Sequence, residues 1–240
     1  ESIVRKGLVS HETAAQLSSD IAEFAALVNY VGICVVDDNG VREVCCQLLP
    51  RLRPASTIVI HSTVSPDLCK ELAAQAQANN LRLIDAPVSG GSPAAKAGTL
   101  AVMVGGDADV LAAVRPVFET FARFIVHLGD VGAGQHGKLI NNSLLAANIG
   151  LAHHALDAAE ELSLDRQAFV DLINASSGRS FGFEVRARLL HPALFHHGAS
   201  LLAKDVSLLG DALGDYGSFA PLRNAASVFL SFALQERVER

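Results

Sequence analysis

The feature that most constrains the fold of this chain is a change of pattern near Gly134. Before it, short runs rich in β-branched residues alternate with segments in which apolar residues recur at helical spacing. This alternation is typical of βαβ units, which build a mostly parallel sheet covered by helices. The predicted strands are residues 31–36, 57–61, 81–86, 100–104 and 124–128, and the predicted helices between them are residues 40–49, 66–78 and 107–122.

Beyond Gly134 the strand-like runs stop, while helical periodicity continues almost to the last residue. Residues 135–162 predict one helix of about 28 residues, or about 42 Å at 1.5 Å per residue. Further helices are predicted at residues 165–174, 183–190, 201–212 and 221–235. We therefore expect an α/β domain over residues 1–131 and an all-helical domain over residues 132–240 that begins with a long interdomain helix.

Composition narrows the possible partners. Half of the residues are hydrophobic and 18% are charged, as in compact globular proteins. The formal net charge of −6 forms no basic stripe, so nucleic acid is not an expected partner. No apolar stretch reaches the roughly 18 residues that span a bilayer, and the four cysteines lack the C-x-x-C spacing of metal or redox sites. We expect a cytoplasmic protein with reduced thiols and no membrane contact.

A glycine-rich segment ends the third predicted strand. Residues 85–91 read D-A-P-V-S-G-G, and G-T-L and M-V-G-G follow before residue 107. Consecutive glycines let backbone amides converge on an anion, so Ser89, Gly90 and Gly91 can hold a carboxylate, with the Ser89 hydroxyl free for a substrate oxygen. For Ser-Gly-Gly alone, the alternative is an ordinary strand-ending turn.

A second segment opens the long helix, where residues 132–142 read G-A-G-Q-H-G-K-L-I-N-N. Lys138 and Asn142 are four residues apart, so both project from one helix face and can reach the same ligand. A positioned amine can take the hydroxyl proton when an alcohol is oxidised and return it in the reverse reaction. The alternative is a solvated surface lysine. The three glycines also spell G-x-G-x-x-G, but no acidic residue ends a second strand about 20 residues later, so we reject a dinucleotide fingerprint here.

Together these segments resemble the β-hydroxyacid dehydrogenase family, which includes 3-hydroxyisobutyrate dehydrogenase and tartronate semialdehyde reductase. The resemblance implies a Rossmann-like domain followed by the helical domain, and a reaction that transfers hydride between NAD or NADP and a small 3-hydroxy acid or its semialdehyde. It makes Lys138 the catalytic acid/base and Asn142 the residue that orients substrate, with Ser89, Gly90 and Gly91 on the substrate. NAD is slightly preferred, as the family's commoner cofactor.

The same resemblance places the cofactor. Lys204 and the following aspartate match the family's late K-D helix, in which the lysine lies near cofactor and substrate. Val35 and Val36 stand where the family carries a Leu-Pro pair under the nicotinamide ribose, and Thr63 matches a hydroxyl near the cofactor. The family begins with a strand, a true G-x-G-x-x-G and a helix, which we do not find in this sequence. If this unit is missing, a sheet edge should be exposed.

Several interpretations stay open. A catalytically silent ligand-binding homologue is one alternative, and an imine reductase-like enzyme is another, although imine reductases of this architecture usually lack the lysine at position 138. Arg179 can pair with a substrate carboxylate or lie on the surface. The paired histidines at 153–154 and 196–197 have no ligand spacing, so no metal is expected. An apolar cluster on the long helix predicts a homodimer or higher oligomer, through Leu144, Leu145, Ile149 and Leu151.

Overall fold

The computed structural model describes residues 18–189, 191–214, 217 and 219–234. Its first half contains a six-stranded sheet in which β5 pairs with β3 and β4 on one side and with β6 on the other. The pairs β1–β2, β2–β3 and β5–β6 are parallel, whereas β5 runs antiparallel to β3 and β4. The strands are β1 (Tyr30–Ile33), β2 (Thr57–Ile60), β3 (Arg82–Asp85), β4 (Val88–Ser89), β5 (Leu100–Gly105) and β6 (Ala122–Gly129).

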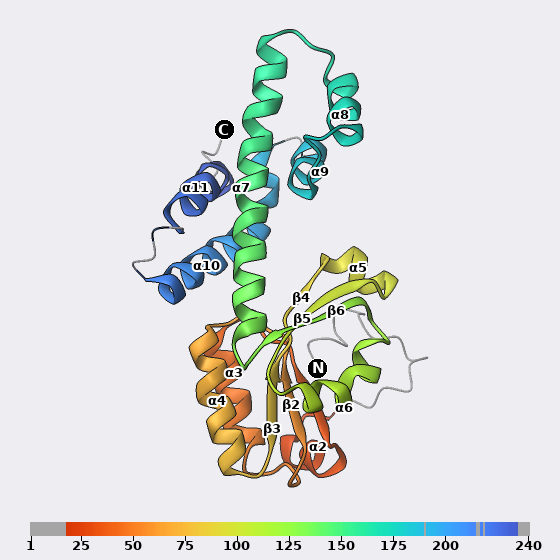
Figure 1. Ribbon diagram of the computed structural model, residues 1–240, viewed down its shortest axis with the longest axis vertical. Helices are drawn as coiled ribbons and strands as arrows, with labels where there is room; N and C mark the ends of the chain where they lie inside the picture. Colours follow the sequence, from red (N-terminus) through yellow and green to blue (C-terminus); the bar gives the residue numbers. More distant parts are fainter. Residues whose placement is uncertain (1–17, 190, 215–216, 218, 235–240) are drawn as a thin grey trace.

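Helices cover both faces of this sheet (Figure 1). All four residues of β2 are buried, and its successive side chains enter two different cores: Ile58 and Ile60 join one, and Val59 joins the other. This follows from the two-residue period of a strand. The covering helices are α2 (Ile21–Leu27), α3 (Asp38–Leu48), α4 (Pro66–Ala78) and α6 (Ala108–Phe118), and the short α5 (Gly91–Ala97) follows β4.

The helices begin where the sequence supplies caps. Asp37, Ser65 and Asp107 accept hydrogen bonds from first-turn amides of α3, α4 and α6, and Pro66 occupies the first turn of α4. Asp20 caps α2 in the same way. Since α3 follows β1 and α4 follows β2, the caps Asp37 and Ser65 stand at the carboxyl ends of these two parallel strands.

The second half is helical and packs around α7 (Ala133–Glu161), a helix of 29 residues that rises from the sheet (Figure 1). Buried residues of α7, α10 and α11 form one core, which includes Leu139, Ile149, Leu209 and Phe229. The elements after α7 are α8 (Arg166–Ala175), α9 (Phe181–Arg188), the 3-10 turn η1 (Pro192–Phe195), α10 (His196–Leu213) and α11 (Phe219–Leu234).

The fold class expected from the sequence is confirmed: a mostly parallel α/β sheet is followed by helices, and a single long helix joins the two parts. The sequence did not predict α2, β4, α5 or the antiparallel pairing of β5. In the part of the chain that the structure describes, β1 has a hydrogen-bonded neighbour on one side only, namely β2. Across these same residues, no helix combines the length and the apolarity of a membrane span.

Candidate active site

The site is organised around the junction of β3 and α7. The carboxylate of Asp85, the last residue of β3, accepts hydrogen bonds from the backbone amides of Gly132 at 2.6 Å and Gln135 at 2.8 Å. First-turn amides of a helix have no partner within the helix, so a fully buried carboxylate is well placed to bind them. Asp85 therefore fixes the start of α7 against the sheet, and Lys138 lies one turn further along that helix.

Two glycines make this junction possible. A Cβ on Gly134 would lie 2.4 Å from the Met103 carbonyl oxygen, and one on Gly105 would lie 2.7 Å from the Gly134 nitrogen. Both contacts are with backbone, which cannot move aside as a flexible side chain can. Gly105 and Gly134, the latter one of the three glycines that resembled a dinucleotide fingerprint, thus permit the close approach of α7 to β5.

Burial sets the electrostatics of Asp85. Loss of solvent raises the pKa of its carboxyl from 3.8 to about 6, and the amide hydrogen bonds act in the opposite direction. The desolvation of a buried charge outweighs its hydrogen bonds in this case.

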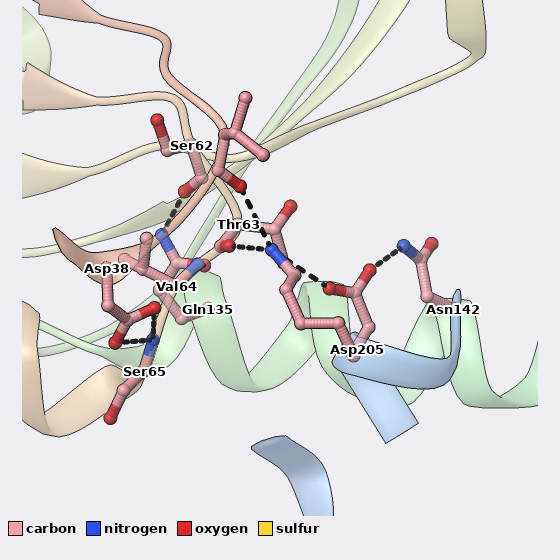
Figure 2. Close-up of polar contacts among 10 residues, drawn as sticks. Asp38, Ser62, Thr63, Val64, Ser65, Gln135, Asn142 and Asp205 are labelled. Carbon is pink, nitrogen blue, oxygen red and sulfur yellow. Dashed lines mark hydrogen bonds and ion pairs between the residues drawn. The ribbon is translucent and has the colours of Figure 1, made fainter. Parts of the chain in front are cut away.

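Gln135 joins α7 to the loop after β2 (Figure 2). Its side chain is fully buried, and it donates to the Ser62 carbonyl oxygen at 2.8 Å and accepts from the Val64 amide at 3.2 Å. The Ser62 hydroxyl in turn accepts from the Val35 amide at 2.7 Å, which ties in the loop after β1. Both loops at the carboxyl ends of β1 and β2 are therefore held at one position relative to α7.

Lys204 of α10 bridges the helical half to these loops (Figure 2). Its ammonium donates to the carbonyl oxygens of Thr63 at 2.6 Å and Val36 at 3.4 Å, and lies 3.6 Å from the Asp205 carboxylate. The other oxygen of Asp205 accepts from the Asn142 amide at 2.6 Å. Burial raises the pKa of Asp205, while Asn142 and the two nearby lysines counteract this shift.

Lys138 lies beside this network on α7. Burial lowers the pKa of its ammonium from the ordinary lysine value; the Asp205 charge raises it, and the Lys204 charge lowers it further. This is the shift that a lysine needs to exchange protons nearer neutral pH.

Lys138, Asn142, Ser89, Gly90 and Gly91 all line one cavity of about 740 Å³. It lies between the β4–α5 turn and the helices α7, α9 and α10. The predicted substrate residues, far apart in the sequence, are thus brought to a single cavity. Among the predicted cofactor residues, Lys204 contacts both Val36 and Thr63 directly, and the Val35 amide is bonded to Ser62, the residue before Thr63.

Two further expectations concern Arg179 and the apolar cluster on the long helix. Arg179 is exposed and does not line the cavity, whereas Phe181, two residues later, does. Of the four apolar residues expected on the exposed face of the long helix, Ile149 is fully buried and Leu145 packs against the helical core, because both face α10 and α11. Leu144 and Leu151 are exposed.

The sequence assigns no role to Asp85 and Gln135, although both lie within the two motifs, or to Phe181. The only sequence hint of a role for Gln135 is a polar, uncharged side chain next to glycines at the start of a helix. Its hydrogen-bond partners could not be predicted, because they lie more than 70 residues earlier in the chain.

Comparisons with known proteins identify the family. A family model described as the NAD binding domain of 6-phosphogluconate dehydrogenase matches residues 2–129, and one described as NAD-binding of NADP-dependent 3-hydroxyisobutyrate dehydrogenase matches residues 132–239. A probable 3-hydroxyisobutyrate dehydrogenase of Mycobacterium tuberculosis is 36% identical over 203 residues, which cover 80% of this chain and 69% of that protein. The chain belongs to the β-hydroxyacid dehydrogenase family. Members of this family are NAD(P)-dependent oxidoreductases that act on the CH–OH group of 3-hydroxy acids.

Further β-hydroxyacid dehydrogenases agree with this assignment. An NAD-dependent L-serine dehydrogenase of Pseudomonas aeruginosa is 33% identical over 80% of this chain and 65% of its own length. The structure of M. tuberculosis 3-hydroxyisobutyrate dehydrogenase with L-serine superimposes with a TM-score of 0.78 at 32% identity, covering 91% of this chain and 78% of that one. A 3-hydroxyisobutyrate dehydrogenase structure from Salmonella typhimurium gives 0.72 at 25% identity, covering 89% and 83%.

The residues at the carboxyl ends of β1 and β2 fit a nicotinamide cofactor. Open α/β sheets bind dinucleotides at this edge. Here the apolar side chain of Val36 is 75% exposed. The Lys204 ammonium lies close by, where it binds the carbonyl oxygens of Val36 and Thr63. An exposed apolar surface bordered by polar groups suits a flat ring with an amide. In the described ranges, no group of three or more His, Cys, Asp and Glu side chains could hold a metal ion.

Proposed function

We propose that this β-hydroxyacid dehydrogenase interconverts a small 3-hydroxy acid and its semialdehyde, with Lys138 as general acid/base. The observation that carries the proposal is the position of Lys138: a desolvated ammonium on the wall of a cavity that it shares with Ser89 and Asn142. A lysine with an ordinary structural role would have its ammonium in solvent or in an ion pair.

The chain's own residues perform three tasks in this proposal. The amides of Gly90 and Gly91 and the Ser89 hydroxyl bind the substrate carboxylate. Asn142, itself held by Asp205, orients the substrate hydroxyl. Neutral Lys138 then takes the hydroxyl proton on its Nζ as the carbonyl forms, and in the reduction it returns that proton to the oxygen.

Val35, Val36, Thr63 and Lys204 would hold the nicotinamide end of NAD or NADP, with NAD slightly preferred as the family's commoner choice. When bound, this group accepts the hydride from the hydroxyl-bearing carbon, or donates it in the reverse reaction. The Lys204 side chain, which already contacts both loops, would keep them aligned with Lys138.

The direct test is nicotinamide absorbance at 340 nm with 3-hydroxyisobutyrate and with L-serine, each with NAD⁺ and with NADP⁺. The proposal predicts turnover of at least one acid, and the ratio of kcat/KM for the two cofactors settles the preference. Absence of turnover with every combination, on folded protein and in both directions, would remove the enzymatic proposal and favour a ligand-binding role.

We further propose a homodimer or higher oligomer and a cytoplasmic location. Support for the oligomer comes from Leu144 and Leu151, which are 51% and 61% exposed on α7. Burial of such side chains against a second copy would stabilise the association. Sedimentation of the wild type beside Leu151→Asp tests this, because a charged side chain in the interface should shift the protein toward monomer.

A further inference from the structure

The cavity beside Lys138 has two chemically different parts. Its polar corner contains Ser89, Lys138 and Asn142, which suffice for the carboxylate and hydroxyl of a small acid. Apart from Thr99, Asn141 and Asn148, the remaining wall is apolar. Its larger side chains come from three helices and include Leu145 and Ile149 of α7, Phe181 and Val185 of α9, and Leu202 of α10. A small hydroxy acid bound at the polar corner would leave this wall uncovered.

The apolar part lies away from the cofactor side. Lys204 of α10 contacts Val36 and Thr63 in the loops after β1 and β2, and none of the three residues lines the cavity. Lys138 and Asn142 therefore stand between the cofactor loops and the apolar wall. A nicotinamide held by those loops would not fill the apolar part, which is left for the substrate.

The size of the cavity also exceeds what a small branched acid needs. Its volume of about 740 Å³ falls within the range of roughly 300–1,000 Å³ that encloses drug-sized ligands. The packing of α9 on α7 fixes one wall of this cavity. The two helices approach closely at Gly182, where a Cβ would lie 2.6 Å from the Cβ of Asn148. This close contact holds α9 against α7, and Phe181 and Val185 of α9 line the cavity.

We propose that this cavity selects 3-hydroxy acids whose C2 substituent is apolar and larger than methyl, such as a benzyl group, with the substituent packed against Phe181 and Val185. The inference rests on the proposed function, because it takes the substrate carboxylate and hydroxyl to lie at the polar corner. Phe181 is 61% exposed without a ligand, so a bound aromatic group would remove part of its ring from water.

Three acids that differ only at C2 test this proposal: 2-benzyl-3-hydroxypropanoate, 3-hydroxyisobutyrate with its methyl group, and L-serine with its ammonium group. Binding to the chain is measured by calorimetry, and kcat/KM is measured separately with NAD⁺ and NADP⁺. We expect the benzyl acid to bind at least about tenfold more tightly than the methyl acid, since hydrophobic pockets discriminate by roughly that factor per added group. L-Serine should bind most weakly.

A matched pair of variants locates the effect. Phe181→Gln should weaken binding of the benzyl acid at least about threefold and leave the methyl acid unchanged, because only the larger group reaches the ring. Phe124→Gln is the control, since Phe124 is also 61% exposed but lies on β6 outside the cavity; it should change neither affinity.

The outcomes separate the two proposals. Tighter binding or faster turnover of the methyl acid or L-serine than of the benzyl acid would overturn the inference and leave the proposed function standing. The inference also falls if Phe181→Gln weakens all three acids equally. If none of the acids binds or turns over, the proposed function fails and the inference fails with it.

Discussion

The side-chain amide of Asn142 on α7 donates a 2.6 Å hydrogen bond to the buried carboxylate of Asp205 on α10. Residues 63 positions apart in the sequence are thus joined within the site, and Asp205 is next to Lys204, which contacts the loops after β1 and β2. The position of Asn142 in the cavity therefore depends on α10 as well as on α7.

Removal of the Asp205 carboxylate should destabilise the protein. In Asp205→Ala the buried Asn142 amide loses its acceptor, which costs about 1–3 kcal/mol of unfolding free energy. Asp205→Asn keeps an acceptor oxygen and should cost less. Urea unfolding of both, beside Asp211→Ala at an exposed position of α10, measures the difference. Equal losses for Asp205→Ala and Asp211→Ala would show that the contact contributes nothing.

The charges around Lys138 should move the pH profile in opposite directions. Oxidation requires neutral Lys138, so kcat/KM should rise with pH through the pKa of that ammonium. Lys204 lowers this pKa and Asp205 raises it. The rise should therefore move to higher pH in Lys204→Met and to lower pH in Asp205→Asn, as measured from pH–rate profiles. Shifts of the same sign in both variants would contradict this coupling.

Asp85 should make stability depend on pH in a direction unusual for a carboxylate. Its pKa is about 6 in the folded protein against 3.8 ordinarily, so the folded state binds the proton more tightly and stability falls as pH rises from 4 to 6. The loss is at most roughly 3 kcal/mol, at about 1.4 kcal/mol per pKa unit. Asp85→Asn removes this contribution. The unfolding free energy of wild type minus that of Asp85→Asn should thus decrease over this range, and a constant difference would refute the assignment.

Gly134→Ala should be destabilising although alanine is the better helix former. Helix propensity favours alanine by about 1 kcal/mol, but the new Cβ would lie 2.4 Å from the Met103 carbonyl oxygen, and such overpacking typically costs about 1–3 kcal/mol. At Gly178 the nearest atom to an added Cβ is an ordinary 3.7 Å away, so Gly178→Ala serves as the control. Thermal unfolding of the two variants compares them, and equal midpoints would rule out the close contact.

The sequence predicted those parts of the fold that have a local signal. Periodicity and caps located α3, α4, α6 and the long α7, because each has several turns or a capping residue. The two-residue β4 and the seven-residue α5 are too short to show a periodic pattern of apolar residues in the sequence. Strand direction also leaves no local trace, so the antiparallel pairing of β5 was not foreseen.

In the candidate site, too, the sequence predicted the residues that lie in a local motif and missed those that do not. The motifs around Ser89, Lys138 and Asn142 pointed to residues that the fold brings to one cavity. The apolar wall could not be foreseen, since Leu145, Val185 and Leu202 have the spacing of ordinary core positions and face the cavity only because α9 and α10 pack on α7. Arg179 was considered for its charge, but the position of α9 directs Phe181 to the cavity instead.

The measurement that tests the central claim most directly is kcat of Lys138→Ala, with and without added ethylamine, beside Lys96→Ala on the exposed face of α5. If Lys138 transfers the proton, its loss should lower kcat by about 100- to 10,000-fold. The free amine should restore part of the rate, while Lys96→Ala remains at the wild-type level. A Lys138→Ala enzyme within a few-fold of wild type would contradict the account.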